Sequence, residues 1–355
     1  MSRDPDAVPE DPVKGGLPWA KAPPAGVDPV ARMADGPADL AGGRIAVGMK
    51  VHFFADASWA SNTRTITALD TARGVMTFDE PVSFKTGASS RYHVEDSKVH
   101  LDQPGEGWFD TATQTVDYKA PPGFDGTGVG ASGLHSILDI VDAARITLSG
   151  LTFADAATTA GEDGNIGSGV ATVRSTGIPV TNGITQNTIT HTLGAAVNLD
   201  YKTGGSTVSA NDIRWTNEAC AFPAAIQMDQ TRDTLIARNL LRDVPRMGMR
   251  VDHSKQSVMS GNNFIEHNAI LRTMQQTSDG GSIYIWSGTD RVALGDTDIS
   301  DHTVELNPGF VAPGTVHDNF YWSPSGQTMK FSDLPFAEGQ ALGYDKGSDI
   351  KRVPC

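Results

Sequence analysis

The sequence is poor in cysteine and has no long apolar run. Its 355 residues include only two cysteines, Cys220 and Cys355, which exclude a disulfide-dense scaffold and a four-cysteine zinc site. No stretch approaches the roughly 20 apolar residues of a transmembrane helix, so no membrane insertion is expected. The N-terminal residues lack the apolar core of a secretory signal. This predicts a cytoplasmic protein, or a periplasmic or secreted one if an export signal has been lost.

Positive charge is scarce as well. Lys and Arg number 28 against 42 Asp and Glu, which gives a formal net charge of −14. Each contact with a phosphate needs a cation, so this balance argues against nucleic acid or an anionic membrane surface as the main partner. The sequence also contains no phosphate-binding loop, zinc-ligand spacing or nucleotide-binding fingerprint. Hydrophobic residues make up 39% of the chain, which is enough to bury a core.

Helical periodicity is weak, whereas glycine and proline are abundant. The 38 glycines among 355 residues favour a turn-rich β architecture over a helical bundle. Seven prolines between Pro5 and Pro29 predict an extended arm over residues 1–44. Hairpin patterns at residues 64–78 and 107–118 predict a β-hairpin-rich extension over residues 45–130, packed on the domain that follows.

A repeat begins near residue 137. Segments of the form apolar-x-x-polar-x-apolar start at residues 146, 184, 208, 236, 259 and 316. Five of the six carry Asn at the fourth place: Asn187, Asn211, Asn239, Asn262 and Asn319. An Asn side chain can bond the backbone of a turn, and it can stack on the Asn of the next coil. A period of 20–30 residues without helical patterning predicts a β-solenoid over residues 131–330, followed by a tail over 331–355.

A second strand pattern follows each Asn turn. Alternation places Val197 and Leu199, and their counterparts in later coils, in the core. The outward face of these strands is then polar and aromatic. It carries Asn198, Gln227, Asp229, Arg250, Asp252, Tyr284 and Trp286. His253 falls inward in this register, which indicates either a packed core histidine or a bulge.

Three passages resemble a known group of proteins. They are residues 91–110, the Asp-Gly-Gly of residues 279–281, and the closing region of residues 319–326 and 342–346. Together they resemble the right-handed parallel β-helix (pectin-lyase-like) superfamily, and within it the bacterial β-helix glycoside hydrolases of the xylosidase and fucosidase type. The resemblance covers about residues 45–350. It implies an all-β chain, a single right-handed parallel β-helix with an N-terminal β-rich extension, and a polysaccharide or oligosaccharide as the partner.

The chain also departs from this group. The proline-rich arm replaces a longer N-terminal stretch, and the interval from Thr289 to His317 lacks a further acidic segment that the group usually carries. One catalytic carboxylate is therefore missing or supplied from elsewhere. The alternatives to a glycoside hydrolase are a polysaccharide lyase and a non-catalytic β-helix that binds glycan or serves structurally.

Glycoside hydrolysis needs two carboxyl groups, one on each side of the scissile bond. Asp252 and Asp279 belong to consecutive coils and are the predicted catalytic pair. Asp279 is the stronger candidate, because it begins the Asp-Gly-Gly motif that the resemblance singles out. Each has a structural alternative, since Asp-Gly-Gly also forms turns and Asp252 can pair with Arg250. Asp229 forms a similar ladder with Asp200, for which turn capping is the better interpretation.

The remaining residues of the outward face, together with Glu218 on a predicted loop and the inward-facing His253, are predicted to bind substrate. Tyr284 and Trp286 can stack on sugar rings. Arg250 and His253 would suit a lyase, in which Ca²⁺ could neutralise a substrate carboxylate. For a hydrolase no cofactor or metal is expected, and the oligomeric state stays open. The predicted substrate-binding residues are Tyr284, Trp286, Arg250, Asp229, Gln227, Asn198, Glu218 and His253.

Overall fold

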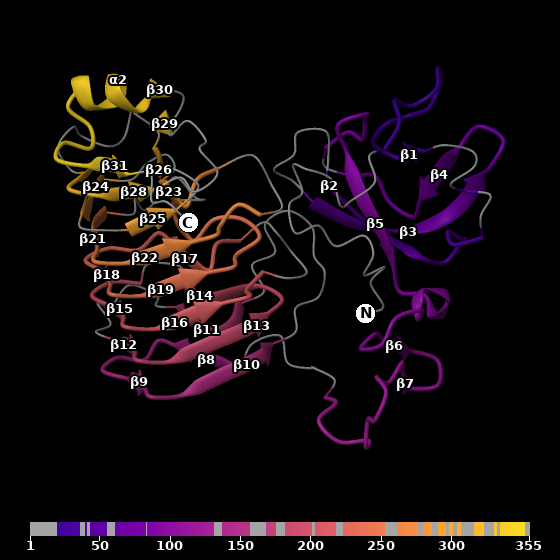
Figure 1. The fold of residues 1–355 in the computed structure, drawn as a ribbon, viewed down its shortest axis with the longest axis horizontal. Helices are drawn as coiled ribbons and strands as arrows, with labels where there is room; N and C mark the ends of the chain where they lie inside the picture. Colours follow the sequence, from indigo (N-terminus) through magenta and orange to yellow (C-terminus); the bar gives the residue numbers. More distant parts are fainter. Residues whose placement is uncertain are drawn as a thin grey trace. The chain divides into compact units, whose positions relative to one another are not determined.

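The structure is a computed structural model. It divides the chain into two compact units, which are described separately: one takes in the described residues up to Gly130 and the other those from Ile137 onward (Figure 1). The residues described are 20–35, 40, 43–54, 61–82, 84–130, 137–156, 168–174, 182–200, 203–217, 223–252, 261–275, 280–285, 290–295, 298–300, 304–306, 316–322, 330–331 and 334–351.

The first unit is built on a five-stranded antiparallel sheet with the strand order β1-β4-β3-β2-β5. The hairpin predicted over residues 64–78 is confirmed as β3 paired with β4, with Gly74 in the turn at a φ of 67°. A core that includes Val51, Phe53 and Met76 packs against the sheet. The strands are β1 (Arg32–Ala34), β2 (Lys50–Phe54), β3 (Ser61–Asp70), β4 (Val75–Phe78) and β5 (Arg91–Glu95).

A short 3-10 helix and a second hairpin complete this unit. The helix η2 (Lys98–His100) follows β5, and Ser97 caps it through a hydrogen bond that its side chain accepts from the Val99 amide. Strands β6 (Gly107–Asp110) and β7 (Thr115–Tyr118) form the hairpin predicted over residues 107–118, with Phe109 opposite Val116.

The second unit consists mainly of three parallel sheets. The β8 sheet contains β8 (Leu138–Val141), β11 (Ser168–Arg174), β14 (Ala195–Asp200), β17 (Ile226–Asp229), β20 (Met249–Asp252), β23 (Ile283–Ile285) and β26 (Val304–Leu306). The β9 sheet contains β9 (Thr147–Ser149), β12 (Gly183–Thr185), β15 (Thr207–Ser209), β18 (Leu235–Ala237), β21 (Gly261–Glu266), β24 (Asp290–Gly295) and β27 (Val316–His317). The β10 sheet contains β10 (Thr152–Ala156), β13 (Thr188–Thr192), β16 (Asp212–Arg214), β19 (Leu240–Arg242), β22 (Ala269–Leu271), β25 (Asp298–Ser300), β28 (Phe320–Trp322) and β31 (Asp349–Lys351).

Successive strands of the chain enter these three sheets in turn. The chain passes from β8 to β9 to β10 and then returns to the first sheet with β11, one rung further along (Figure 1). Strand β31, from the segment predicted as a tail, continues the β10 sheet beside β28. Near it lie β29 (Lys330–Phe331), β30 (Leu334–Pro335) and the helix α2 (Phe336–Ala341). The all-β class is confirmed, and the parallel sheets are consistent with a solenoid.

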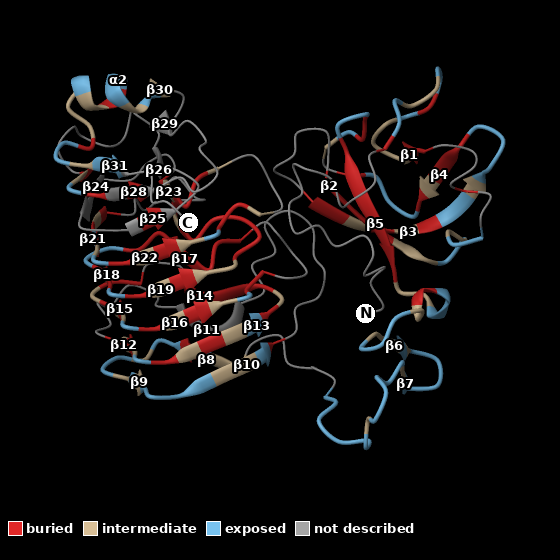
Figure 2. Ribbon diagram, viewed as in Figure 1, coloured by how far each residue is buried: buried red, intermediate tan, exposed pale blue. Residues whose placement is uncertain are grey.

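The core of the second unit follows from the short strands. In the inner three-residue strands of the β9 and β10 sheets the middle residue points inward. Val208, Ile236, Ile213 and Leu241 are fully buried in this way, and Figure 2 shows the buried residues following the strands from coil to coil. Burial of each such side chain stabilises the fold by roughly 1.5–3 kcal/mol. One apolar position per strand is therefore sufficient, which leaves the flanking positions free for polar residues.

An asparagine ladder connects the coils. The side-chain amide of Asn187 donates to Asn211 Oδ1 at 3.1 Å, that of Asn211 to Asn239 Oδ1 at 2.9 Å, and that of Asn239 to Asn268 Oδ1 at 3.0 Å. All four are at most 2% exposed. The predicted stacking is confirmed for the first three members.

The prediction that Asn262 is the fourth member of the ladder is wrong. It lies in β21, where its side chain donates to Asp233 at the surface. The ladder passes instead through Asn268, because Ile265 and Ile270 supply the buried apolar positions of that coil. Residues 265–270 fit the repeat pattern as well as residues 259–264 do, and the longer coil displaces the ladder position by six residues.

Candidate active site

One outward row of the β8 sheet contains four of the predicted site residues. Asn198 pairs in register with Gln227, Gln227 with Arg250, and Arg250 with Tyr284. The same register continues to Glu305, a further carboxyl group that the sequence pattern did not single out. The residues on either side of Asn198 and Gln227 are fully buried in the core. Strand alternation therefore places this row on the outer face, as predicted.

A second row contains two adjacent carboxyl groups. Asp229 and Asp252 occupy paired register positions at the ends of β17 and β20. Paired positions on neighbouring parallel strands lie about 4.8 Å apart. Both residues are only 5% exposed. Of the predicted carboxylates, these two are brought together by the described part of the structure, whereas the sequence pattern favoured turn capping for Asp229.

Arg250 provides the compensating charge. Its Nη2 donates to Asp252 Oδ2 in an ion pair in which the side chains are 15% and 7% exposed. Its guanidinium also lies 6.0 Å from the centroid of the Tyr284 ring. The ion pair places a positive charge beside one of the two adjacent carboxyl groups.

Most of the described outer face is covered. Asn198 is 2% exposed and Gln227 1%, and Gln227 Oε1 accepts a hydrogen bond of 3.3 Å from the Ala224 amide. Asn198 Oδ1 is buried without a hydrogen-bond partner. Since a buried polar atom without a partner destabilises the fold, such an atom calls for a functional or solvent explanation. Asn198 and Gln227 therefore do not line an open groove.

The Asp-Gly-Gly segment packs on a small apolar cluster. Gly280 has a φ of 116°, which favours glycine, and a Cβ there would lie 3.3 Å from Met274 Cε and 3.4 Å from Met247 Cγ. Met247 and Met274 form a buried cluster with Ala224, against which Tyr284 packs. The two methionines therefore support both the glycine turn and the aromatic ring. Sequence reasoning missed them, because a lone Met carries no periodic signal.

Four predicted residues lie outside the described residues: Asp279, Trp286, His253 and Glu218. Their roles stay predictions. Within the described part of the chain, no group of three or more His, Cys, Asp or Glu is arranged to hold a metal ion. The described helices include none that is long and apolar enough to cross a membrane.

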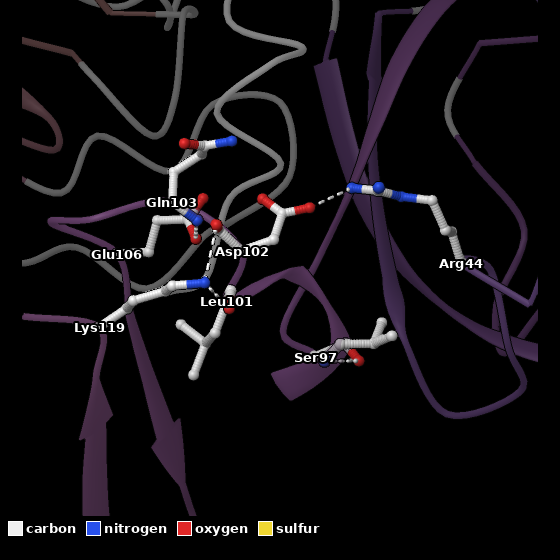
Figure 3. A network of polar contacts seen from close by, with 8 residues as sticks. Arg44, Ser97, Leu101, Asp102, Gln103, Glu106 and Lys119 are labelled. Atoms are coloured by element: carbon white, nitrogen blue, oxygen red, sulfur yellow. Dashed lines mark hydrogen bonds and ion pairs between the residues drawn. The ribbon is translucent and has the colours of Figure 1, made fainter.

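Within the passage at residues 91–110, the residues between η2 and β6 form a loop that charged side chains hold in place (Figure 3). Lys119 Nζ donates to the backbone oxygens of Asp102, at 2.8 Å, and Leu101, at 3.4 Å. Glu106 accepts a hydrogen bond of 2.6 Å from the Gln103 amide, and Asp102 pairs with Arg44 at 3.1 Å. These contacts fix the loop that precedes β6. This motif is accounted for by its structural role within the first unit.

The closing region of the sequence contains a buried acid. Asp345 is fully buried, and it accepts hydrogen bonds from Ser348 and, at 3.0 Å, from the Asn319 side-chain amide. Burial raises the pKa of Asp345 above its usual value, although the hydrogen bonds from Ser348 and Asn319 oppose this shift. Tyr321 is itself buried. Its burial and the charge of Asp345 raise the pKa of Tyr321 well above its ordinary value. These groups join β28 to the segment before β31 and do not lie in the rows of the β8 sheet.

Comparison with known proteins adds information on the fold. No family model matches the sequence, and no curated protein matches it either. A solved structure described as "Glycoside hydrolase" is similar with a TM-score of 0.60 at 12% sequence identity. The similarity covers 99% of this chain and 74% of that one. At this identity the likeness shows the fold alone.

Proposed function

We propose that the second unit is a right-handed parallel β-helix and that the protein is a glycoside hydrolase acting on a polysaccharide or oligosaccharide. The observation that carries the proposal is the pair Asp229 and Asp252, one rung apart on the outer face of the β8 sheet. The structural likeness to a glycoside hydrolase supports the same class. So does the resemblance of the Asp-Gly-Gly segment to that group.

The surroundings of the two carboxyl groups suggest a different role for each. Asp252, which is paired with Arg250, is the nucleophile or base, and Asp229 is the proton donor. A separation near 5 Å suits a retaining mechanism. Asp252 then attacks the anomeric carbon while Asp229 protonates the leaving oxygen. A water molecule, deprotonated by Asp229, next releases the sugar from Asp252. Asp279 is the alternative second carboxylate.

The sugar would contact the residues around this pair. Tyr284 and Trp286 supply aromatic surface, and Arg250, Gln227 and Asn198 supply hydrogen-bonding groups. Glu218 precedes β17 and His253 follows β20 in the sequence, and we propose both as further contacts.

A reducing-sugar assay on a panel of plant and bacterial polysaccharides tests the proposal. Asp252→Asn and Asp229→Asn should each lower release at least about 100-fold, because loss of a catalytic carboxyl removes acid, base or nucleophile. Glu266→Gln, on the exposed end of β21, is the matched control and should retain full activity. Equal release by the parent and both Asp variants would contradict the assignment. If Asp279→Asn abolished release and the other two Asp variants did not, Asp279 would be assigned as a catalytic residue in their place.

The burial of Asn198, Gln227, Asp229 and Asp252 counts against access of a substrate to them, and so favours a second candidate, a non-catalytic β-helix that binds glycan at other residues or serves structurally. Under that alternative, no polysaccharide in the panel releases reducing sugar, and glycan binding survives Asp252→Asn. A lyase is distinguished in the same assay by unsaturated products that absorb in the ultraviolet and by dependence on added Ca²⁺.

A further inference from the structure

A second group of charged and aromatic residues lies on the β10 sheet, away from the rows described above. Arg214 and Arg242 occupy paired positions on the adjacent strands β16 and β19, with Asp212 two residues before Arg214. Because the middle residues Ile213 and Leu241 are buried, both arginines point outward. Both side chains are 28% exposed, and that of Asp212 is 34% exposed.

A single carboxylate, that of Asp212, lies close to both guanidinium groups. Asp212 lies 4.0 Å from Arg214 Nε and 3.9 Å from Arg242 Nε, distances too long for hydrogen bonds. Both Nε atoms and Asp212 Oδ1 are covered and have no hydrogen-bond partner. Two guanidinium groups beside one carboxylate leave these three residues with a net positive charge. By contrast, Asp243 and Arg272 nearby form a closed bidentate pair at 2.5 and 2.6 Å.

Trp215 stands beside this pair of arginines. The Arg214 guanidinium lies 4.9 Å from the centroid of the Trp215 ring, and His191 stacks on the ring at 4.9 Å. Trp215 has a φ of 51° and is 39% exposed. This left-handed conformation belongs to the corner between coils, so the distinctive feature of Trp215 is its exposed aromatic side chain at a position that polar residues usually occupy. The equivalent corner positions of other coils carry the polar residues Asp155, His191, Asp243 and Arg272.

We propose that Arg214, Arg242 and Trp215 form a binding patch for a sugar unit that bears an anionic group, either a carboxylate or a sulfate. Guanidinium groups bind both oxyanions through paired hydrogen bonds, and Trp215 fixes the orientation of one of them. The exposed part of the indole adds apolar surface for the rest of the sugar. The patch is independent of the proposed hydrolysis and would hold an acidic glycan on a different sheet from the carboxylate pair.

The net charge of the whole chain does not prevent this contact. At physiological ionic strength charges are screened over about 8 Å, so a bound oxyanion responds mainly to the nearest groups. Charge complementarity at the patch is the reason to assign an anionic sugar. Binding should weaken as salt is added, because the contact is exposed and electrostatic.

The test measures binding of the full chain to carboxylated, sulfated and neutral polysaccharides by isothermal titration calorimetry. The parent should bind at least one anionic polymer about 10-fold more tightly than the neutral one. The double variant Arg214→Gln/Arg242→Gln should lose this preference, and Trp215→Ala should weaken binding several-fold. Asp212→Asn should strengthen binding two- to five-fold, because it removes the internal competitor for the guanidinium groups. A merely structural role for these residues would not produce that gain.

Matched controls keep the result specific. Arg238→Gln and Phe264→Ala change an exposed arginine and an exposed aromatic residue elsewhere and should leave binding unchanged. A double variant that keeps the parent's preference for the anionic polymer would overturn the proposal. So would equal binding of a DNA oligonucleotide, or no binding of any anionic polysaccharide by the folded parent. If the double variant fails to fold by circular dichroism, Arg242→Gln and Asp212→Asn decide the matter.

Discussion

At the scale of single residues, the buried acid Asp345 couples stability to pH. Burial raises its pKa above the ordinary 3.8, so the folded state binds this proton more tightly than the unfolded chain does. Its contribution to stability is therefore present at low pH. That contribution is lost as the pH rises from about 3.8 through the folded-state value.

Asp345→Asn tests this coupling. The amide oxygen can still accept from Ser348 and Asn319, whereas the carboxyl proton is gone. We expect the fall in the free energy of unfolding above pH 4 to become shallower in the variant, as measured by urea titration at several pH values. Asp318→Asn, at an exposed neighbour, should follow the parent. A variant with the same pH slope as the parent would show that Asp345 is not the group responsible.

A second prediction concerns Gly248. A Cβ at this position would lie 2.8 Å from Ile270 Cγ2 and 3.0 Å from the Ser282 backbone oxygen. The backbone oxygen belongs to a neighbouring rung and cannot move independently. Gly248→Ala should therefore lower the free energy of unfolding by about 1–3 kcal/mol, the usual range for overpacking. Gly130→Ala, where a Cβ would meet nothing within 4 Å, is the control. Equal stability of the two variants would count against the close approach.

At the scale of elements, the asparagine ladder is the best-defined connection between coils. Asn239 donates to the Val208 oxygen at 2.9 Å and to Asn268, and it accepts from Asn211. Asn239→Ala leaves these buried groups without partners and should lower the free energy of unfolding by about 2–4 kcal/mol. Asn262→Ala should cost less than about 1 kcal/mol, since that side chain bonds only at the surface. Equal losses in denaturant titrations would contradict the ladder.

The same element shows what the sequence could predict. The Asn repeat and the alternation around Val197 and Leu199 correctly predicted which residues face inward, because burial leaves a periodic pattern. The position of Asn268 was missed, because two segments of one coil fit the same short pattern. The neighbour relation of Asp229 and Asp252 could not be read from either strand alone, since it depends on the register between strands. Met247 and Met274 were missed for a similar reason, because their cluster assembles from residues far apart in the sequence.

At the scale of the molecule, the three parallel sheets place equivalent residues of successive coils on neighbouring strands. Equivalent residues of successive coils lie about 4.8 Å apart, so two acids on neighbouring rungs meet at the spacing that glycoside chemistry uses. The same geometry brings Arg214 and Arg242 together on another sheet. The all-β class and the repeat could be predicted from composition and periodicity. The parallel order of 22 strands in the second unit's three sheets, and the burial of the polar row on the β8 sheet, required the structure.

The most direct test of the account is the configuration of the product sugar. On any substrate that the parent cleaves, proton NMR within the first minutes of reaction reports which anomer is released. Acids one rung apart predict that the product keeps the configuration of the substrate, and that Asp252→Asn abolishes its formation. Release of the inverted anomer would contradict the assignment of Asp229 and Asp252, because inversion needs carboxyl groups about 6.5–9.5 Å apart.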